Sequence, residues 1–216
     1  GITTAMNGYD YRVVVSNGGA SVCTATLNSA GANLTVNETP EITAQPGNST
    51  ICENTNTSFT VNAGVTTSPG YQWQVSTNGG VSYSNVVDGG IYAGSTTATL
   101  TLTGAPLANN GYLYRAIVSG TCSPNATSDG AVLTVEQNVV IGAAPVAVIS
   151  CEGSTVQYTV SATGASLTYQ WQEDNGGGFA NIADGGVYSG ATTSTLTLTG
   201  ITTAMNGYDY RVVVSN

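Results

Sequence analysis

The sequence predicts an all-β protein built from antiparallel β-sandwiches that repeat along the chain. Of its 216 residues, 41% are hydrophobic and only 7% are charged, and 28 are glycine; this composition suits short strands joined by turns. Short runs alternate apolar and polar residues. The first seventeen residues, GITTAMNGYDYRVVVSN, recur unchanged as residues 200–216. Alternation predicts strands, and the recurrence predicts a repeat array.

The elements follow in order within the central part of the chain. Period-2 alternation marks strands that are separated by Asn-Gly, Gly-Gly and Ser-Pro-Gly turn signals. Asn78-Gly79-Gly80 predicts a hairpin turn, because its central positions tolerate positive φ. No helix longer than one turn is expected. The predicted strands are 58–61, 71–75, 98–102 and 112–118.

Internal comparison predicts the domain organisation. The exact copy implies a period of 199 residues, and shorter matches such as Tyr-Gln-Trp-Gln recur about 100 residues apart. We expect two alternating domains in each period. Residues 1–37 form the C-terminal part of one domain, residues 38–137 a complete domain, and residues 138–216 the N-terminal majority of the next.

The same comparison predicts how the partial domains are completed. The third segment ends after its Tyr-Arg-Val-Val-Val strand, and it lacks the stretch that residues 18–37 provide after the identical strand of the first segment. We expect that neither end of the chain is a true terminus and that a neighbouring repeat completes each partial domain.

Charge and cysteine content exclude several classes of function. The chain has no Lys or His and only three Arg against twelve carboxylates, a net charge of −9, so nucleic acid is excluded as a partner. No segment has the roughly 20 consecutive apolar residues that span a bilayer, so no membrane insertion is expected in this segment. The four cysteines include no Cys-x-x-Cys pair, which favours disulfides over zinc and predicts an extracellular setting.

One motif pair resembles a known family. Trp73 and Trp171 each lie in a predicted strand, and Asn-Gly-x-x-Tyr-Arg follows about forty residues later, a pattern typical of an immunoglobulin-like sandwich. The chain resembles the Ig-like repeats of very large cell-surface and adhesin proteins of Bacteroidota-type bacteria, including those linked to gliding motility. The shared motifs are YQWQ, NGYxYR and a Cys followed seven residues later by Phe. The resemblance covers the whole chain and implies tandem Ig-like domains on a bacterial cell surface.

The Ig-like alignment predicts the core and the disulfides. The usual inter-sheet bridge would fall near Val61 and Ala116, which are apolar, so packing replaces it. We predict an intradomain bridge from Cys52 to Cys122, which would contribute about 4 kcal/mol. Cys23 and Cys151 would each pair with an adjacent repeat or, alternatively, cross-link separate subunits. The predicted core aromatic residues are Trp73, Trp171, Phe59, Tyr158, Tyr114 and Tyr210.

The residues that bear chemistry predict no enzyme. Without His or Lys, a Ser-His-Asp triad, a Schiff-base lysine and a His-bound metal are impossible. Asp88 and Asp184 recur in identical Asp-Gly-Gly turns, which favours a role in the turn over catalysis. The sequence predicts no cofactor; Asp88 and Asp184 are weak candidates for Ca²⁺, as are the acidic linkers around Glu38, Glu41 and Glu136.

The three arginines follow a tyrosine in the same strand of each copy. Arg12, Arg115 and Arg211 could hook a ligand or act structurally. The structural interpretation is favoured: Arg115 is expected to lie over an aromatic ring or to pair with a carboxylate such as Asp88.

Three hypotheses of function result. The favoured one is a structural segment of a long extracellular filament, stalk or adhesin, whose partners are neighbouring copies of the repeat. The second is a carbohydrate- or cell-binding module that acts by avidity on surface glycans; an exposed aromatic platform would support it. The third is a non-covalent fibre whose subunits complete each other by strand exchange.

Overall fold

The computed structural model describes residues 1–16 and 26–216. Apart from three short 3₁₀ helices, every regular element in these residues is a β-strand, and the strands pair in antiparallel fashion. The all-β prediction is confirmed. Cys23 lies outside the described residues, so its predicted pairing remains a prediction.

The chain divides into two compact units. The boundary after Thr134 falls close to the predicted boundary at 137/138, whereas residues 1–37 belong to the same unit as most of the first sandwich. Unit 1 comprises Gly1–Ser49, Asn56–Ala105 and Gly111–Thr134; unit 2 comprises Thr50–Thr55, Pro106–Asn110 and Val135–Asn216.

The N-terminal segment forms a two-stranded hairpin. Residues 10–16 pair with residues 26–33, and the register shifts by one residue between Tyr11↔Ala32 and Val14↔Asn28. All strand residues of this hairpin are exposed. Its elements are η1 (Thr4–Met6), β1 (Asp10–Tyr11), β2 (Val14–Ser16), β3 (Thr26–Asn28) and β4 (Ala32–Asn33).

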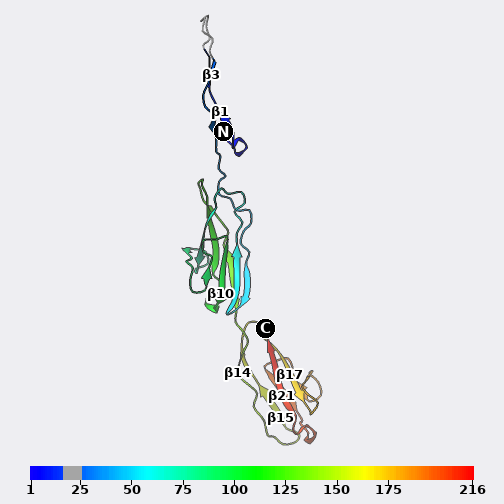
Figure 1. Ribbon diagram of the computed structural model, residues 1–216. Coiled ribbons are helices and arrows are strands. Elements are labelled where there is room, and N and C mark those ends of the chain that lie inside the picture. Colours follow the sequence, from blue (N-terminus) through cyan, green and yellow to red (C-terminus); the bar gives the residue numbers. More distant parts are fainter. Residues whose placement is uncertain (17–25) are drawn as a thin grey trace, which may run out of the picture. The chain divides into compact units, whose positions relative to one another are not determined.

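Two sheets make up the first sandwich, which comes next along the chain (Figure 1). One sheet has the order β6-β10-β9; the other has the order β5-β13-β11-β7-β8, with β12 added beside β11. The elements are β5 (Ser49–Cys52), β6 (Thr55–Thr60), β7 (Gly70–Ser76), β8 (Ser84–Asn85), β9 (Tyr92–Ala93), β10 (Thr99–Ala105), η2 (Leu107–Asn109), β11 (Leu113–Ser119), β12 (Ala126–Thr127) and β13 (Ala131–Glu136).

Alternating residues of these strands form the core. Every second residue of β11 is buried and those between are half-buried, so one face is enclosed while the other is partly open, as expected for a sandwich strand. Trp73 and Tyr114 are fully buried, and Phe59 stacks on Tyr114 with ring centroids 4.9 Å apart. The Trp73 indole N–H donates to the Thr97 carbonyl at 2.9 Å, so burying this polar group leaves it hydrogen-bonded.

The C-terminal residues repeat this plan with fewer strands. They form three small sheets, β14-β16, β15-β20-β19 and β18-β17-β21; β17 and β21 lie side by side in Figure 1. The elements are β14 (Val140–Ala143), β15 (Thr155–Thr159), β16 (Ser161–Thr163), β17 (Thr168–Asp174), β18 (Ala180–Asn181), β19 (Tyr188–Ser189), β20 (Thr195–Thr199), η3 (Thr203–Met205) and β21 (Asp209–Ser215).

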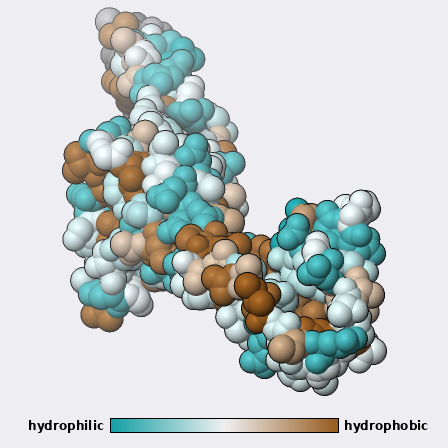
Figure 2. All heavy atoms as spheres, turned by 90° about the horizontal axis from the view of Figure 1, so that it is seen from below, coloured by the Kyte–Doolittle hydropathy of each residue, from teal (hydrophilic) through white to brown (hydrophobic). Residues whose placement is uncertain are grey.

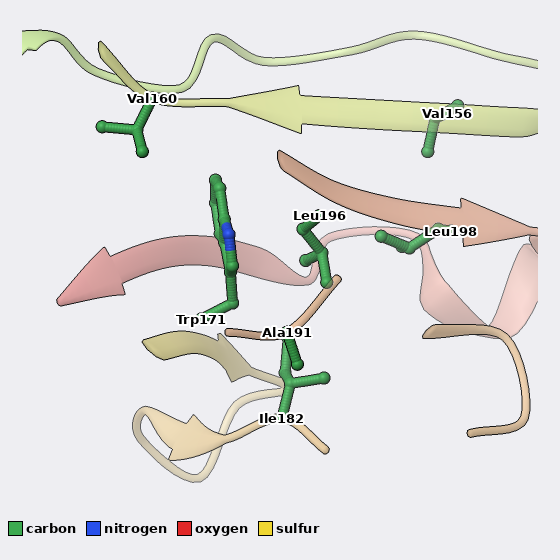
Figure 3. Packing of buried hydrophobic residues seen from close by; sticks show 7 residues of the cluster. All are labelled: Val156, Val160, Trp171, Ile182, Ala191, Leu196 and Leu198. Atoms are coloured by element: carbon green, nitrogen blue, oxygen red, sulfur yellow. The ribbon is translucent and has the colours of Figure 1, made fainter. Parts of the chain in front are cut away.

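The second core is organised around Trp171. Figure 3 shows its indole extending from its strand toward Val160, with Leu196 beside it. Trp171 is fully buried, and its N–H donates to the Thr193 carbonyl at 2.9 Å, as Trp73 does in the first sandwich. The two sandwiches therefore share both their core residue and its hydrogen bond.

Candidate functional site

The Asp-Gly-Gly turns are structural clamps. The Asp88 carboxylate accepts the backbone N–H of Ser95 at 2.7 Å, and Asp184 accepts that of Ala191 at the same distance. Hydrogen bonding from Ser95, mainly from its backbone, lowers the pKa of Asp88. Gly90 has a φ of 58°, which glycine adopts without steric cost. Each carboxylate therefore holds its own turn, which leaves the expectation of Ca²⁺ without added support.

Metal ligands do not cluster in the described part of the chain. Within residues 1–16 and 26–216, no group of three or more His, Cys, Asp or Glu side chains could hold an ion. In the same residues, no helix is both long and apolar enough to cross a membrane.

Two arginines lie over aromatic rings. The Arg115 guanidinium carbon is 3.7 Å from the Tyr83 ring centroid, and Arg115 Nε donates to the Gln74 amide oxygen at 2.9 Å. Arg211 lies 3.9 Å from the Phe179 ring centroid. Arg115 was expected to contact either an aromatic ring or a carboxylate, and it contacts the ring of Tyr83. A stacked guanidinium with a hydrogen-bond partner positions its strand rather than offering a free hook.

The structure contradicts the predicted bridge between Cys52 and Cys122. Both thiols are free: Cys52 is exposed, while Cys122 is half-buried with its sulfur 3.6 Å from the Asn37 carbonyl oxygen. Cys151 is also free and exposed, and its predicted bridge to an adjacent repeat remains a prediction.

Strand direction explains why these cysteines do not meet. Cys52 ends β5 beside the far end of β13, where the Glu53 N–H donates to the Glu136 carbonyl. Strand β11 starts from that end, since the Val135 N–H donates to Asn110 Oδ1 and the Gly111 N–H donates to the Leu133 carbonyl just before β11 begins. It then runs away for seven residues before Cys122 follows. That run is roughly 20 Å long, whereas a disulfide needs Cα atoms within about 7 Å. The cysteines lie at opposite ends of the sheet.

The first sandwich covers its central tyrosine completely. Strand β13 pairs with β11 and buries its alternate residues Ala131, Leu133 and Val135. Tyr114 beneath it is fully buried, and its hydroxyl lies 3.1 Å from that of Tyr92. Because Trp73 and Tyr114 are both buried, they provide no exposed aromatic platform for a sugar.

The second sandwich leaves the corresponding tyrosines partly exposed. Tyr158 and Tyr210 take the places of Phe59 and Tyr114 and stack with centroids 5.0 Å apart, but both are only half-buried. They line a cavity of about 290 Å³ together with Val148, Val156, Asn206 and Tyr208. Of the predicted core residues of this sandwich, Trp171 is therefore fully buried, whereas Tyr158 and Tyr210 remain partly exposed to solvent.

Two unpaired backbone segments border this cavity. Strand β21 pairs with β17 along one edge, and no described strand pairs with its other edge. Residues 148–151, which correspond to β5 in the first sandwich, form no strand, and the Ile149 side chain is fully exposed. We name the cavity and these two borders the open edge.

Two half-buried tyrosines, Tyr188 and Tyr210, meet beside the open edge, where Tyr210 lines the cavity. The Tyr188 hydroxyl donates to the Glu173 carboxylate and lies 3.4 Å from the Tyr210 hydroxyl. Burial and the contact with Glu173 raise the pKa of Tyr188, and burial raises that of Tyr210. Glu173 was not predicted from the sequence. It follows Tyr-Gln-Trp-Gln at the position where the first sandwich has Val75, and this exchange of an apolar residue for a carboxylate could have indicated it.

Exposed apolar side chains are frequent in the N-terminal hairpin and again in residues 140–149. Apolar residues appear among hydrophilic ones on the face shown in Figure 2. In most single domains, exposed large apolar residues occur singly rather than in runs. The exposed apolar and aromatic residues of the hairpin are Ile2, Tyr9, Tyr11, Val13, Val14, Val15 and Leu27.

Comparisons with known proteins support the fold. A family model described as a domain of unknown function (DUF8696) matches residues 42–137, less than half of the chain. A search of curated proteins found no match.

Solved structures of tandem Ig domains resemble the whole chain. Titin I-band fragment I67–I69 is 16% identical with a TM-score of 0.63, covering 100% of this chain and 71% of that one. Drosophila OTK extracellular domains 3–5 are 17% identical with a TM-score of 0.57, covering 100% and 68%. Sidekick-1 immunoglobulin domains 1–5 are 18% identical with a TM-score of 0.59, covering 99% and 45%.

These likenesses confirm tandem immunoglobulin-like sandwiches and, at such identities, show the fold alone. The finer resemblance to Bacteroidota adhesins finds no support among them and remains a prediction.

Proposed function

We propose that the chain is a structural segment of a long extracellular filament, stalk or adhesin made of tandem Ig-like domains at a bacterial cell surface. Its work is mechanical, it catalyses no reaction, and its partners are neighbouring copies of the same repeat. In such arrays, stability depends on each domain and on its neighbours.

One observation carries this proposal. The seventeen residues that open the chain also close it, and both copies form β-strand after the same short 3₁₀ helix. Residues 10–16 pair with residues 26–33, which come after them, whereas β21, the same sequence in the second unit, pairs with β17, which comes before it. An identical strand that recurs 199 residues later is the feature that a periodic array requires.

The interior of the molecule fits a mechanical role. No described, non-exposed residue has a buried side-chain nitrogen or oxygen without a hydrogen-bond partner. The repeated acidic and basic side chains hold turns and strands, as Asp88 and Arg115 do. The polar groups that recur in each domain therefore support the scaffold. Glycan partners, calcium and the extracellular location remain expectations from the sequence.

The mass of the native polypeptide under reducing, denaturing conditions tests the proposal. A mass far above 21.7 kDa is expected, because a covalent tandem array contains many periods. A mass near 21.7 kDa would overturn it and leave separate subunits. Protease treatment of intact cells provides the test of location: the polypeptide should be cleaved without lysis, whereas a cytoplasmic control protein should remain intact.

A further inference from the structure

We propose that a disulfide spans each junction between consecutive domains, joining Cys151 of one repeat to Cys122 of the next, and Cys52 to Cys23 of the next. The inference rests on the proposed function for its partners, because an array of repeats brings a neighbouring domain to each junction. The three cysteines of the described residues are free. This pairing gives each of them a partner without a bridge inside a single sandwich.

Cys52 lies at the end of the first sandwich from which the chain continues. The residue that follows it, Glu53, donates its N–H at 2.8 Å to the carbonyl of Glu136, the last residue of β13. The Asn138 N–H in turn donates to the Glu53 carboxylate at 3.1 Å. Cys52 is therefore adjacent to the junction formed by residues 136–138.

Cys122 contacts the junction that precedes the same sandwich. Its sulfur lies 3.6 Å from the Asn37 carbonyl oxygen. The N–H groups of Thr121 and Glu38 both donate to Thr67, at 3.0 Å to its carbonyl and at 2.8 Å to its hydroxyl. These contacts hold the loop that carries Cys122 against the start of the domain.

Asn37 and Glu136 occupy the same position in consecutive domains. Each directly follows a Leu-Thr-Val sequence, and a cysteine comes fifteen residues after each, Cys52 in one case and Cys151 in the other. In both, the N–H of the preceding valine donates to an asparagine Oδ1, at 2.9 Å and 3.0 Å. The two junctions can therefore be compared residue by residue.

This comparison brings the two kinds of cysteine to one carbonyl group. At Glu136 the carbonyl accepts the N–H that follows Cys52, and at Asn37 the carbonyl contacts the sulfur of Cys122. A carbonyl oxygen has two lone pairs, so both contacts can form on it. In an array, the two cysteines then lie on either side of a single oxygen atom, and a disulfide needs their Cα atoms within about 7 Å.

The second unit supports the same arrangement at its own junction. Asn216 Nδ2 donates to the Gln137 carbonyl at 3.2 Å, between the two residues that Glu53 contacts. Asn216 is the counterpart of Asn17, and Cys23 comes six residues after Asn17. In the next repeat, the segment that carries this cysteine therefore begins at the junction.

The bridge forms by exchange with an oxidant that itself carries a disulfide. The thiolate of one cysteine attacks the oxidant and forms a mixed disulfide, and the thiolate of the second cysteine then displaces the oxidant. The two thiols lose two protons and two electrons, and the oxidant is reduced to two thiols. Cys52 and Cys151 are exposed, so the first attack can begin at either of them.

Tryptic mapping of the native polypeptide without reduction tests the pairing. Because the chain has no Lys, trypsin cuts it only after its three arginines. Each repeat gives two fragments, 13–115 and 116–211, with two cysteines in each. With free thiols blocked beforehand, we expect like fragments to be linked to like, since Cys52 and Cys23 share the first fragment. Mass spectrometry identifies the joined peptides, and reduction should separate all fragments.

A bridge inside one sandwich would give a different map. It would link unlike fragments, because Cys52 and Cys122 lie in different ones. Links between unlike fragments, links between two copies of the same cysteine, or fragments that are separate before reduction would each overturn the proposal.

An extended chain isolates one junction. A copy of residues 18–37 placed after Asn216 brings the number of cysteines from four to five. After oxidation in dilute solution with glutathione disulfide, maleimide should label three thiols of the unfolded chain before reduction and five after it. Cys52→Ser should remove the bridge, so all four remaining thiols react; Cys122→Ser is the matched control and should retain it, so two react.

The same labelling distinguishes the competing pairings. A bridge that survives Cys52→Ser would lie within the second sandwich, and one that is lost in Cys122→Ser would lie within the first; either result would overturn the proposal, as would five reactive thiols before reduction. None of these results changes the mass of the reduced native polypeptide, so failure of this inference is distinguishable from failure of the proposed function.

Discussion

The Cys52→Ser, Cys122→Ser double variant tests the placement of these thiols at opposite ends of the first sandwich. A bridge between them would close a loop of 70 residues and contribute about 4 kcal/mol in the chain-entropy model. The structure shows an exposed thiol and a half-buried one with a single contact to Asn37. A serine hydroxyl can retain that contact, so we expect a loss below about 1 kcal/mol.

Urea denaturation separates these magnitudes. With a urea dependence of about 2 kcal/mol per M, loss of a bridge would move the midpoint by roughly 2 M, whereas the free-thiol arrangement moves it by less than about 0.5 M. Tryptophan fluorescence reports both sandwiches, and the parent chain with and without reductant is the control. A midpoint that falls by roughly 2 M in the variant, with an equal fall in the reduced parent, would refute the strand directions of the first sandwich.

Three further substitutions test the clamps and the core. Asp88→Asn should flatten the acid dependence of unfolding: the pKa of Asp88 is lowered in the folded state, so its stabilisation is complete above the unfolded pKa and is lost as pH falls through the folded one. Urea midpoints across the acid range measure this, and an unchanged slope would contradict it. Gly94→Ala should destabilise by at least about 1 kcal/mol more than Gly79→Ala in thermal unfolding; both have positive φ, but only the Cβ at Gly94 would lie 2.4 Å from a backbone oxygen. Equal losses of stability in the two variants would show that the clash at Gly94 does not contribute to the destabilisation. Trp73→Phe should cost about 3 kcal/mol in urea unfolding, because it leaves a cavity and an unpaired Thr97 carbonyl; a loss below about 1 kcal/mol would show that the site relaxes.

The sequence predicted those parts of the fold that depend on local pattern. Alternation around Trp73 and Tyr114 predicted buried strand positions, and both residues are fully buried. The Asp-Gly-Gly repeat indicated a turn, and Asp88 holds one. These predictions succeeded because the side-chain period of a strand and the φ demands of a turn are properties of a few neighbouring residues.

The position of the cysteines depends on information that local pattern does not contain. Cys52 and Cys122 both lie near strand ends, as predicted. Which end each occupies depends on whether an odd or an even number of strands lies between them, and β8 and β9 are only two residues long. Such short strands are not marked by alternation, so the sequence did not settle the number of passes across the sandwich.

The open edge was partly foreseen and partly missed. Comparing residues 200–216 with 1–17 showed which segment succeeds the last strand in the repeat. The half-buried state of Tyr158 and Tyr210 was not predicted, because burial of a tyrosine depends on the strand that covers it. The hydrogen bond from Tyr188 to Glu173 was also missed, since it joins side chains from two different sheets.

The burial of Trp171 in a sandwich whose last edge is unpaired sets an order of assembly. The indole, its bond to the Thr193 carbonyl and the apolar cluster around it are in place without any strand beyond β21. A chain synthesised from its N-terminus can therefore enclose each tryptophan before the closing strand has been made. In the second sandwich the Trp171 core is therefore complete while Tyr158 and Tyr210 are still half-buried, so the tryptophan core and the tyrosine layer can form in separate steps.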